Sequence, residues 1–214
     1  AMVTAAEHGD LEKVVGTCET FRSRHREVAA ALAAGPRLRE LESAIDNASD
    51  SLDSMARALT VLREASPRIR DHILSHGERL SAKLFVAALE AARFKAGAVD
   101  PIDVIITDGP FGDAAPDPSA TRDAARQVIG PLLRKLDIVV MPGFLGRAPE
   151  GGTATLGRGG SDLTATTLAR ALDATEVTLW KDVPGLLTAD PRVVQDARLL
   201  PLVHPSEAAE LAYY

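Results

Sequence analysis

A run of glycines in the second half of the sequence offers a cradle for an anion. Three glycines surround a cation ahead of an expected helix, in the run Gly157-Arg158-Gly159-Gly160-Ser161-Asp162. Glycines let the backbone approach a ligand closely and adopt positive φ, free N–H groups at a helix start favour an anion, and arginine can hold a carboxylate or phosphate through two parallel hydrogen bonds. The run could therefore hold a small acid next to a phosphate, or it could be a glycine-rich turn in which Ser161 or Asp162 is an ordinary N-cap.

Two well-known phosphate-binding loops do not fit this run. A Walker loop requires Gly-Lys-Ser/Thr after the glycines, and none follows here. The dinucleotide-binding fingerprint places its glycines after a strand with G-x-G-x-x-G spacing, which is also missing. The run therefore belongs to neither class.

Length and composition bound the class of protein. The chain has 214 residues, of which 46% are hydrophobic and 25% charged, so it can bury a core and is not intrinsically disordered. A net charge of −6 argues against a nucleic-acid groove. No apolar run approaches the ~18 residues of a membrane span, the N-terminus lacks a signal-peptide pattern, and Cys18 is the only cysteine. We therefore expect a cytoplasmic protein without an intrachain disulfide.

Residues 1–97 carry almost no strand signal and predict three long helices. Gly35-Pro36 and Ser66-Pro67 separate one helical pattern from the next. Between these breaks, apolar residues recur mostly at three- and four-residue steps, a period that places them on one face of a helix. This expected apolar face consists of Leu38, Leu41, Ile45, Leu52, Met55, Leu59 and Leu62.

Residues 98–214 alternate short β-branched runs with helical patterns. The expected strands are 103–107, 138–141 and 177–180, and the expected helices are 121–135, 161–172 and 205–213. This alternation predicts an α/β fold with a mostly parallel sheet covered by helices on both faces. Three strands would leave unpaired edges, so we expect partner strands from residues outside this sequence or from another chain. Trp180 is expected in the core at a strand end, rather than as a platform for a nucleotide base.

The glycine run also resembles the signature of a known family. L-G-R-G-G-S-D at 156–162 is similar to the signature of aspartate kinases, which have the amino acid kinase fold, a three-layer α/β/α sandwich. Further stretches resemble motifs of that family in the family's order: I-L-S-H-G-E-R-L-S at 73–81, I-I-T-D with F-G within 105–112, P-G-F-L-G at 142–146, W-K-D-V-P-G-L-L-T-A-D-P-R at 180–192 and E-A-A-E-L-A at 207–212. The resemblance covers most of the chain. It makes 1–97 the helical part, and 98–214 the substrate- and nucleotide-binding part, of one kinase domain.

The resemblance implies transfer of the γ-phosphoryl group of ATP, with Mg²⁺, to the β-carboxylate of L-aspartate. The product, 4-phospho-L-aspartate, would open lysine, threonine and methionine biosynthesis. By position, Glu78 would contact the aspartate amino group, Arg158 would hold the substrate carboxylate, and Asp162 would help to position the reacting centre. The other implied contacts are Gly159, Gly160 and Ser161 to the substrate, and Lys181, Asp182, Leu187, Asp190 and Arg192 to the nucleotide. No residue is assigned to a metal, and the family implies a homodimer or higher homo-oligomer.

Without the resemblance, three of these residues have plainer interpretations. Glu78 could be a helix-surface glutamate, Asp182 a turn former and Arg192 a solvated surface charge.

The sequence also departs from the family pattern. It contains neither the family's first strand, K-F-G-G-T-S, whose lysine contacts the transferring phosphate, nor the C-terminal regulatory ACT domains, and Leu187 replaces the usual Tyr and His76 the usual Phe. We interpret the chain as an aspartate kinase catalytic domain without those segments. The alternative is a non-catalytic domain that binds aspartate or nucleotide, or that dimerises.

Overall fold

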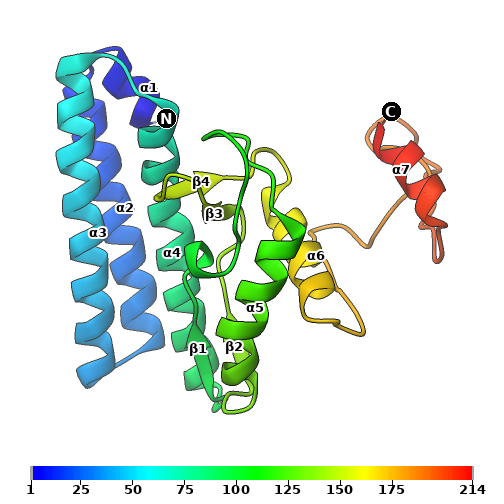
Figure 1. The fold of residues 1–214 in the computed structure, drawn as a ribbon. Coiled ribbons are helices and arrows are strands. Elements are labelled where there is room, and N and C mark those ends of the chain that lie inside the picture. Colours follow the sequence, from blue (N-terminus) through cyan, green and yellow to red (C-terminus); the bar gives the residue numbers. More distant parts are fainter. Residues whose placement is uncertain (1, 214) are drawn as a thin grey trace. The chain divides into compact units, whose positions relative to one another are not determined.

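The computed structural model describes residues 2–213. The chain divides into two compact units, residues 1–177 and residues 178–214. The first unit contains most helices, the sheets and the glycine run, whereas the second contains a looped segment and the last helix (Figure 1). Each unit is described below by itself.

Four helices build the first part of unit 1, and the predicted breaks separate the three long ones. Their bounds are Met2–Glu7 (α1), Leu11–Leu32 (α2), Gly35–Leu62 (α3) and Pro67–Ala91 (α4). The Ser66 side chain accepts a hydrogen bond from the backbone N–H of Ile69 at 3.4 Å, and a proline stands at the start of α3 and of α4. Proline fits the first helical turn because its missing N–H would be unpaired there anyway. Local sequence chemistry therefore sets these helix boundaries.

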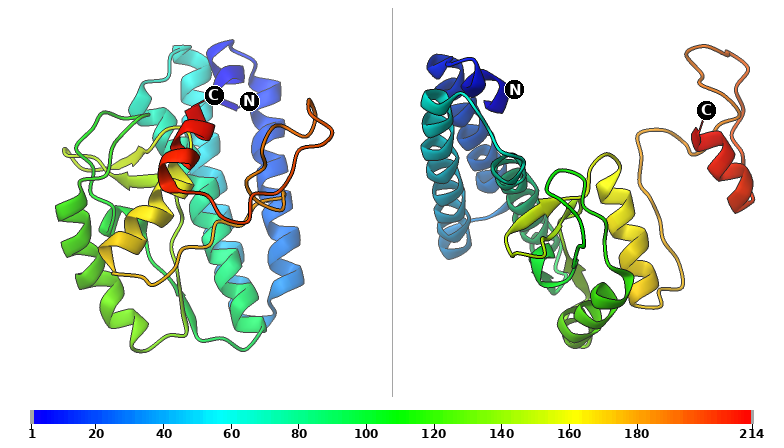
Figure 2. Two further views of the ribbon diagram at one scale, coloured as in Figure 1. Left: turned by 90° about the vertical axis from the view of Figure 1, so that its right-hand side faces the viewer. Right: turned by 45° about the horizontal axis from the view of Figure 1, so that its top comes forward.

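The predicted apolar face of α3 is mostly confirmed. Leu41, Ile45, Leu52 and Leu59 are each no more than 3% exposed and pack against α1, α2 and α4. Leu62 departs from the prediction, because it is 68% exposed in the last turn of the helix. The three long helices run side by side in Figure 2 and bury two apolar clusters between them.

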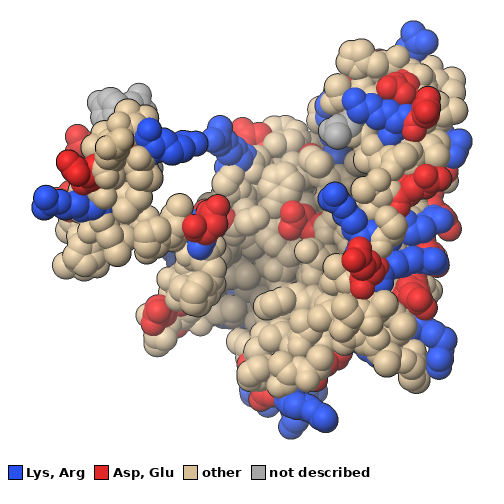
Figure 3. All heavy atoms as spheres, turned by 180° about the vertical axis from the view of Figure 1, so that it is seen from behind, with Lys and Arg blue, Asp and Glu red and all other residues tan. Residues whose placement is uncertain are grey.

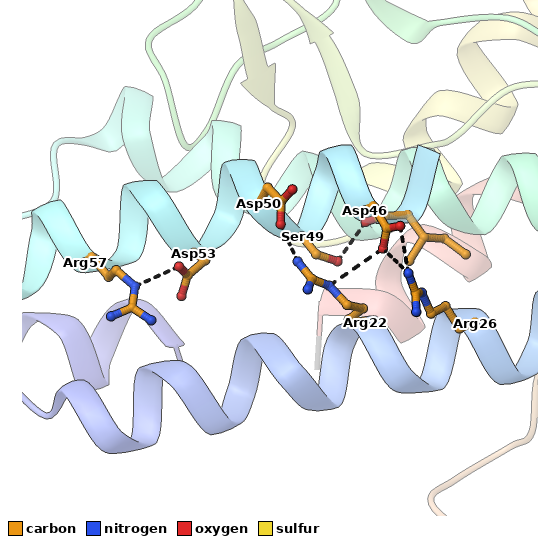
Figure 4. Close-up of polar contacts among 8 residues, drawn as sticks. Arg22, Arg26, Asp46, Ser49, Asp50, Asp53 and Arg57 are labelled. Carbon is orange, nitrogen blue, oxygen red and sulfur yellow. Dashed lines mark hydrogen bonds and ion pairs between the residues drawn. The ribbon is translucent and has the colours of Figure 1, made fainter. Parts of the chain in front are cut away.

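Ion pairs connect α2 to α3 on the outside of these apolar clusters (Figure 4). Arg26 places one amino group 2.7 Å from both carboxylate oxygens of Asp46, and Arg22 pairs with Asp46 and Asp50. Exposed pairs of this kind typically contribute about 0–1 kcal/mol each, so they align the two helices more than they stabilise them. Over the face drawn in Figure 3, positive and negative side chains of the described residues are interspersed.

Two small sheets follow the helices. β1 (Ala96–Ala98) pairs in parallel with β2 (Ile138–Val140), and β3 (Leu145–Arg147) pairs antiparallel with β4 (Thr153–Thr155). The accompanying helices are η1 (Pro101–Asp103), α5 (Pro118–Leu133) and α6 (Gly160–Ala171). α4 packs against β1 and β4, while α5 covers β2 and α6 packs against α5 and β3 (Figure 1). Helices thus lie on both sides of the strands, as the α/β prediction required.

The strand expected over 103–107 is wrong in its extent. Asp100 caps a short 3₁₀ turn at Pro101–Asp103, and the N–H groups of Val104 and Ile105 both donate to the carbonyl of Pro101. Within the run 103–107, only Ile106 and Thr107 make isolated strand-like bridges, to Arg147 and Pro116. Val104 and Ile105 are fully buried, so their apolar character signalled burial, while their backbone donors were already used in the turn.

Three short strands had no sequence signal. β1 reads Ala-Gly-Ala and lacks the β-branched residues that favour strands. β3 and β4 form a hairpin around Gly151 and Gly152, whose φ angles are +83° and +86°. Positive φ costs glycine little, so the two glycines allow the chain to reverse there.

Unit 2 departs from two expectations and confirms a third. Residues 177–180 form no strand among the described residues, and Trp180 is 89% exposed rather than in a core. A β-branched run becomes a strand only where a partner strand supplies hydrogen bonds, and none pairs with this run within residues 2–213. The expected last helix is present as α7 (Pro205–Tyr213), and Glu207 in its first turn accepts the N–H of His204 at 2.9 Å.

Candidate functional site

Two glycines in the left-handed region shape the run between β4 and α6. Gly157 has φ +69°, and Gly159, the N-cap of α6, has φ +78°. The N–H of Gly160 donates to the carbonyl of Gly157 at 3.1 Å, which closes a tight turn around Arg158. A Cβ at position 157 would also lie 2.4 Å from Oδ1 of Asp113, so a side chain there would displace that carboxylate as well as strain the backbone. The predicted cradle is therefore a defined turn.

The loop after β2 supports this turn from behind. A Cβ on Gly143 would lie 2.9 Å from Cα of Ser161, and one on Gly160 would lie 2.8 Å from the ring of Phe144. Phe144 accepts the N–H of Leu156 at 2.9 Å and donates its own N–H to the Thr164 hydroxyl at 3.0 Å. The segments 142–146 and 156–162, which resemble family motifs separately, are thus packed together in unit 1.

The charged residues of the turn lie at the start of α6. Arg158 is exposed and precedes the N-cap, while Asp162 stands half-buried in the first helical turn. The N-terminus of a helix carries a partial positive charge and unpaired N–H groups, which favour an anion. The exposed guanidinium and the helix start therefore present positive charge from the same turn.

Glu78 lines a pocket of about 550 Å³ next to the end of β2. The pocket is formed by residues of three segments: Arg24, His25, Val28 and Leu32 from α2, Glu78, Ser81, Ala82, Leu84, Phe85 and Ala88 from α4, and Val140, Met141 and Pro142 at the end of β2 and directly after it. Glu78 is half-buried, and burial raises the pKa of its carboxyl above the ordinary value. Pro142 precedes Gly143, which contacts Ser161. The end of β2 therefore links the Glu78 pocket to the glycine turn.

α4 also carries three polar residues that the sequence analysis missed. Asp71, Ser75 and Arg79 follow one another at four-residue steps, a spacing that aligns them along one side of a helix. Arg79 donates to both carboxylate oxygens of Asp100 at 2.9 and 3.0 Å and to the Thr153 hydroxyl at 2.9 Å. The four-residue repeat was visible in the sequence, but a polar repeat on a helix usually marks a solvated face.

The residues expected to contact the nucleotide all lie in unit 2. Leu187 and Asp190 line a pocket of about 850 Å³, together with Gly185, Leu186, Thr188, Ala189, Leu200, Val203, Glu207 and Glu210. Arg192 donates through its side chain and its backbone N–H to Asp190, and these hydrogen bonds lower the pKa of Asp190 to about 2. Lys181 and Asp182 are exposed and do not line this pocket. Unit 2 therefore brings three of the five expected residues together.

Residues 2–213 contain neither an evident metal-ligand cluster nor a membrane-spanning helix. No cluster of three His, Cys, Asp or Glu side chains in that range could hold a metal ion. None of the helices in that range combines the length and the apolar character that crossing a membrane demands.

Known proteins match both the sequence and the fold. The model of the amino acid kinase family matches residues 1–214. The fold superimposes on the crystal structure of Escherichia coli aspartokinase III in complex with aspartate and ADP with a TM-score of 0.79, at 32% identity, over 100% of this chain and 46% of that chain. The chain therefore belongs to the amino acid kinase family and has its α/β fold.

Two curated relatives to which the chain is similar are named as aspartokinases. Lysine-sensitive aspartokinase 3 of Escherichia coli K12 is 41% identical over an alignment of 170 positions that covers 77% of this chain and 38% of the relative. The aspartokinase of Saccharomyces cerevisiae is 33% identical over an alignment of 218 positions that covers 98% of this chain and 40% of the relative. The chain thus spans about two fifths of the length of these relatives.

Proposed function

We propose that this protein is an aspartate kinase, which transfers the γ-phosphoryl group of ATP to the β-carboxylate of L-aspartate. The observation that carries the proposal is the turn in which Arg158 stands exposed between two left-handed glycines at the start of α6. An arginine and a helix start together suit a small carboxylate beside a phosphate. The fold match to an aspartokinase that holds aspartate and ADP supports the same assignment.

The physics of the reaction explains why the site needs positive charge more than a base. The acceptor carboxylate is already an anion, so no proton has to be removed before it attacks phosphorus. Two anions must instead approach in line, and the protein must offset their repulsion with positioned cations and N–H donors. Arg158 and the start of α6 would supply this charge on the substrate side, and Asp162 would help to order the reacting groups.

Glu78 would bind the other end of the amino acid. Its carboxyl lies in the 550 Å³ pocket, where it could pair with the ammonium group of the substrate. A bound ammonium would favour the ionised carboxylate and so reverse the rise in pKa that burial causes in its absence. Arg158 and Glu78 would then recognise opposite charges on one zwitterionic substrate.

The nucleotide would be held by unit 2, through Lys181, Asp182, Leu187, Asp190 and Arg192. Mg²⁺ commonly binds through substrate phosphates with one or two protein carboxylates, which is compatible with the lack of a three-ligand cluster in residues 2–213. The bound ion would neutralise phosphate charge. Assembly into a homo-oligomer is part of the same proposal.

The test is ADP release measured with ATP and Mg²⁺, with and without L-aspartate. We expect aspartate-dependent release in the wild type and a loss of about 10–100-fold in kcat/KM for aspartate in Arg158→Ala, the cost of a charged hydrogen-bonding partner. Arg158→Lys keeps the charge but not the planar fork, so it restores only part of the activity. Arg122→Ala removes an exposed arginine of α5 and serves as the matched control.

Three results separate the proposal from its competitors. Turnover that does not depend on aspartate would contradict it. Calorimetric binding of aspartate or ATP without ADP release would favour a non-catalytic binding domain. Equal activity of Arg158→Ala and Arg122→Ala would show that the glycine turn does not bind the substrate.

A further inference from the structure

Asp71 is a buried carboxylate with no role in the function proposed above. It stands in the second turn of α4 and is 1% exposed. Its Oδ2 accepts the N–H groups of Gly112 and Thr155 at 2.8 and 2.9 Å, and its Oδ1 accepts the Thr155 hydroxyl at 2.7 Å. All three partners donate to it, which matches the acceptor-only chemistry of an ionised carboxylate.

These hydrogen bonds connect three separate segments of unit 1. Asp71 belongs to the helix that carries Glu78, and Thr155 is the last residue of β4, three positions before Arg158. Gly112 belongs to the loop that also holds Asp113, whose carboxylate lies against Gly157. One side chain therefore fixes both the strand that leads into the glycine turn and the loop that packs against that turn.

Other contacts support the same alignment one and two turns further along α4. The Ser75 hydroxyl accepts a hydrogen bond from Arg79 at 2.7 Å, and Arg79 reaches the Thr153 hydroxyl on β4. Thr153 and Thr155 are two residues apart, so both point to the same side of their strand. The polar residues of α4 thus contact that side of β4 at two points and set how far the helix lies along the strand.

We propose that Asp71 is a positioning residue that holds the Glu78 helix in register with the Arg158 turn. This inference rests on the proposed function, because it assigns to Asp71 the relative placement of the two groups that would bind opposite ends of the amino acid. Asp71 is buried against donors of the protein itself, so it would act through the segments that it joins. A shift of about 1 Å between two binding groups can cost about 10²-fold in rate, so a fixed register has functional weight.

The variants that test this role remove either one hydrogen bond of Asp71 or all of them. Thr155→Val removes only the hydroxyl that donates to Asp71, whereas Thr155→Ser keeps it. Asp71→Asn keeps one carbonyl oxygen as an acceptor, and Asp71→Ala removes both. Ser49→Ala deletes another buried hydroxyl, on α3, which donates to the Ile45 carbonyl and is the matched control (Figure 4).

We expect the KM for aspartate to rise about tenfold in Thr155→Val and further in Asp71→Ala, while the KM for ATP stays within about twofold. Thr155→Ser and Ser49→Ala should keep the wild-type KM. A merely structural role would lower the amount of folded, active protein and leave the KM for aspartate unchanged. A wild-type KM in both Thr155→Val and Asp71→Asn would overturn the inference, whether or not Asp71→Ala folds.

Hydrogen exchange gives a readout that does not need activity. We expect faster exchange of the backbone amides around Gly112 and Thr155 in Thr155→Val than in Thr155→Ser, because loss of one bond loosens the shared carboxylate. Unchanged exchange would overturn the inference. A wild type without aspartate-dependent turnover would instead refute the proposed function, and the exchange experiment would still decide whether Asp71 sets the register.

Discussion

Replacement of Gly160 by alanine tests how tightly the glycine turn is packed. The φ angle at this position is not positive, so alanine could adopt the backbone conformation. The difficulty is space, because the new Cβ would lie 2.8 Å from Cδ2 of Phe144 and 3.0 Å from Cβ of Leu156. The Leu156 N–H donates to the Phe144 carbonyl, which ties the backbones of both neighbours to the turn, and the new Cβ would also lie 3.2 Å from Cα of Phe144.

The expected magnitude follows from two opposing terms. Overpacking of a tight contact typically costs about 1–3 kcal/mol, whereas glycine to alanine in a helix gains at most about 1 kcal/mol. We therefore expect Gly160→Ala to lower the free energy of unfolding by about 1–2 kcal/mol. Gly16→Ala is the matched control, because Gly16 is a helical glycine of α2 with nothing within 4 Å of its added Cβ, and we expect it to gain about 0.5–1 kcal/mol.

Urea unfolding followed by circular dichroism measures the difference. With a slope of about 2 kcal/mol/M, a separation of about 2 kcal/mol between the two variants moves their midpoints apart by about 1 M. Gly160→Ala should also raise the KM for aspartate, whereas Gly16→Ala should leave it unchanged. Equal or reversed midpoints would show that the contacts of Phe144 and Leu156 with position 160 yield freely, and the rigid turn would then be refuted.

Three further perturbations follow from the charged groups. Burial raises the pKa of Glu78 above its ordinary 4.5, so folding favours its protonated form and its contribution to stability falls as the pH rises through the folded pKa. The free energy of unfolding of Glu78→Gln should therefore increase relative to that of the wild type between pH 4 and pH 7 in urea titrations. A difference between the two proteins that does not change with pH would contradict this. Arg192 holds the pKa of Asp190 at about 2, so this pair contributes stability above pH 3.8 that is lost as the pH falls toward 2. Arg192→Ala should return the Asp190 pKa toward 3.8 in a carbon-13 NMR titration. An unchanged Asp190 pKa in this variant would disprove the role assigned to Arg192. Arg79→Ala should lower the free energy of unfolding by about 1–3 kcal/mol, because the Asp100 carboxylate loses its bidentate hydrogen bonds. Arg79→Lys should recover little of this loss. Full recovery of the wild-type stability in thermal denaturation would show that charge alone matters.

The helical part of the fold could be predicted because its signals are local. Gly35-Pro36 and Ser66-Pro67 break the chain by their own backbone chemistry, and the apolar period of α3 needs no knowledge of its neighbours. The strands depend on partners that are distant in sequence. The run at 103–107 is buried without being extended, and β1 becomes a strand only because Ile138–Val140 lies beside it.

The site divides in the same way. Arg158 and Glu78 were singled out because they stand in motifs whose residue order is itself the signal, and their roles stay predictions. Asp71 could not be singled out, since a polar residue on a helix is normally solvated, and its partners Gly112 and Thr155 are 41 and 84 residues away. Trp180 was misplaced for a related reason, because an apolar side chain does not reveal whether a neighbour covers it.

The arrangement of α4 makes its length matter as much as its composition. Seven positions separate Asp71 from Glu78, a rotation of about 700°, so the two side chains lie within about 20° of the same side of the helix. Insertion of one residue between them would swing Glu78 by about 100° and carry it out of its pocket, even if every original side chain were kept. A substitution on the exposed side of this segment keeps the relative direction of Asp71 and Glu78, whereas an insertion or deletion between them changes it.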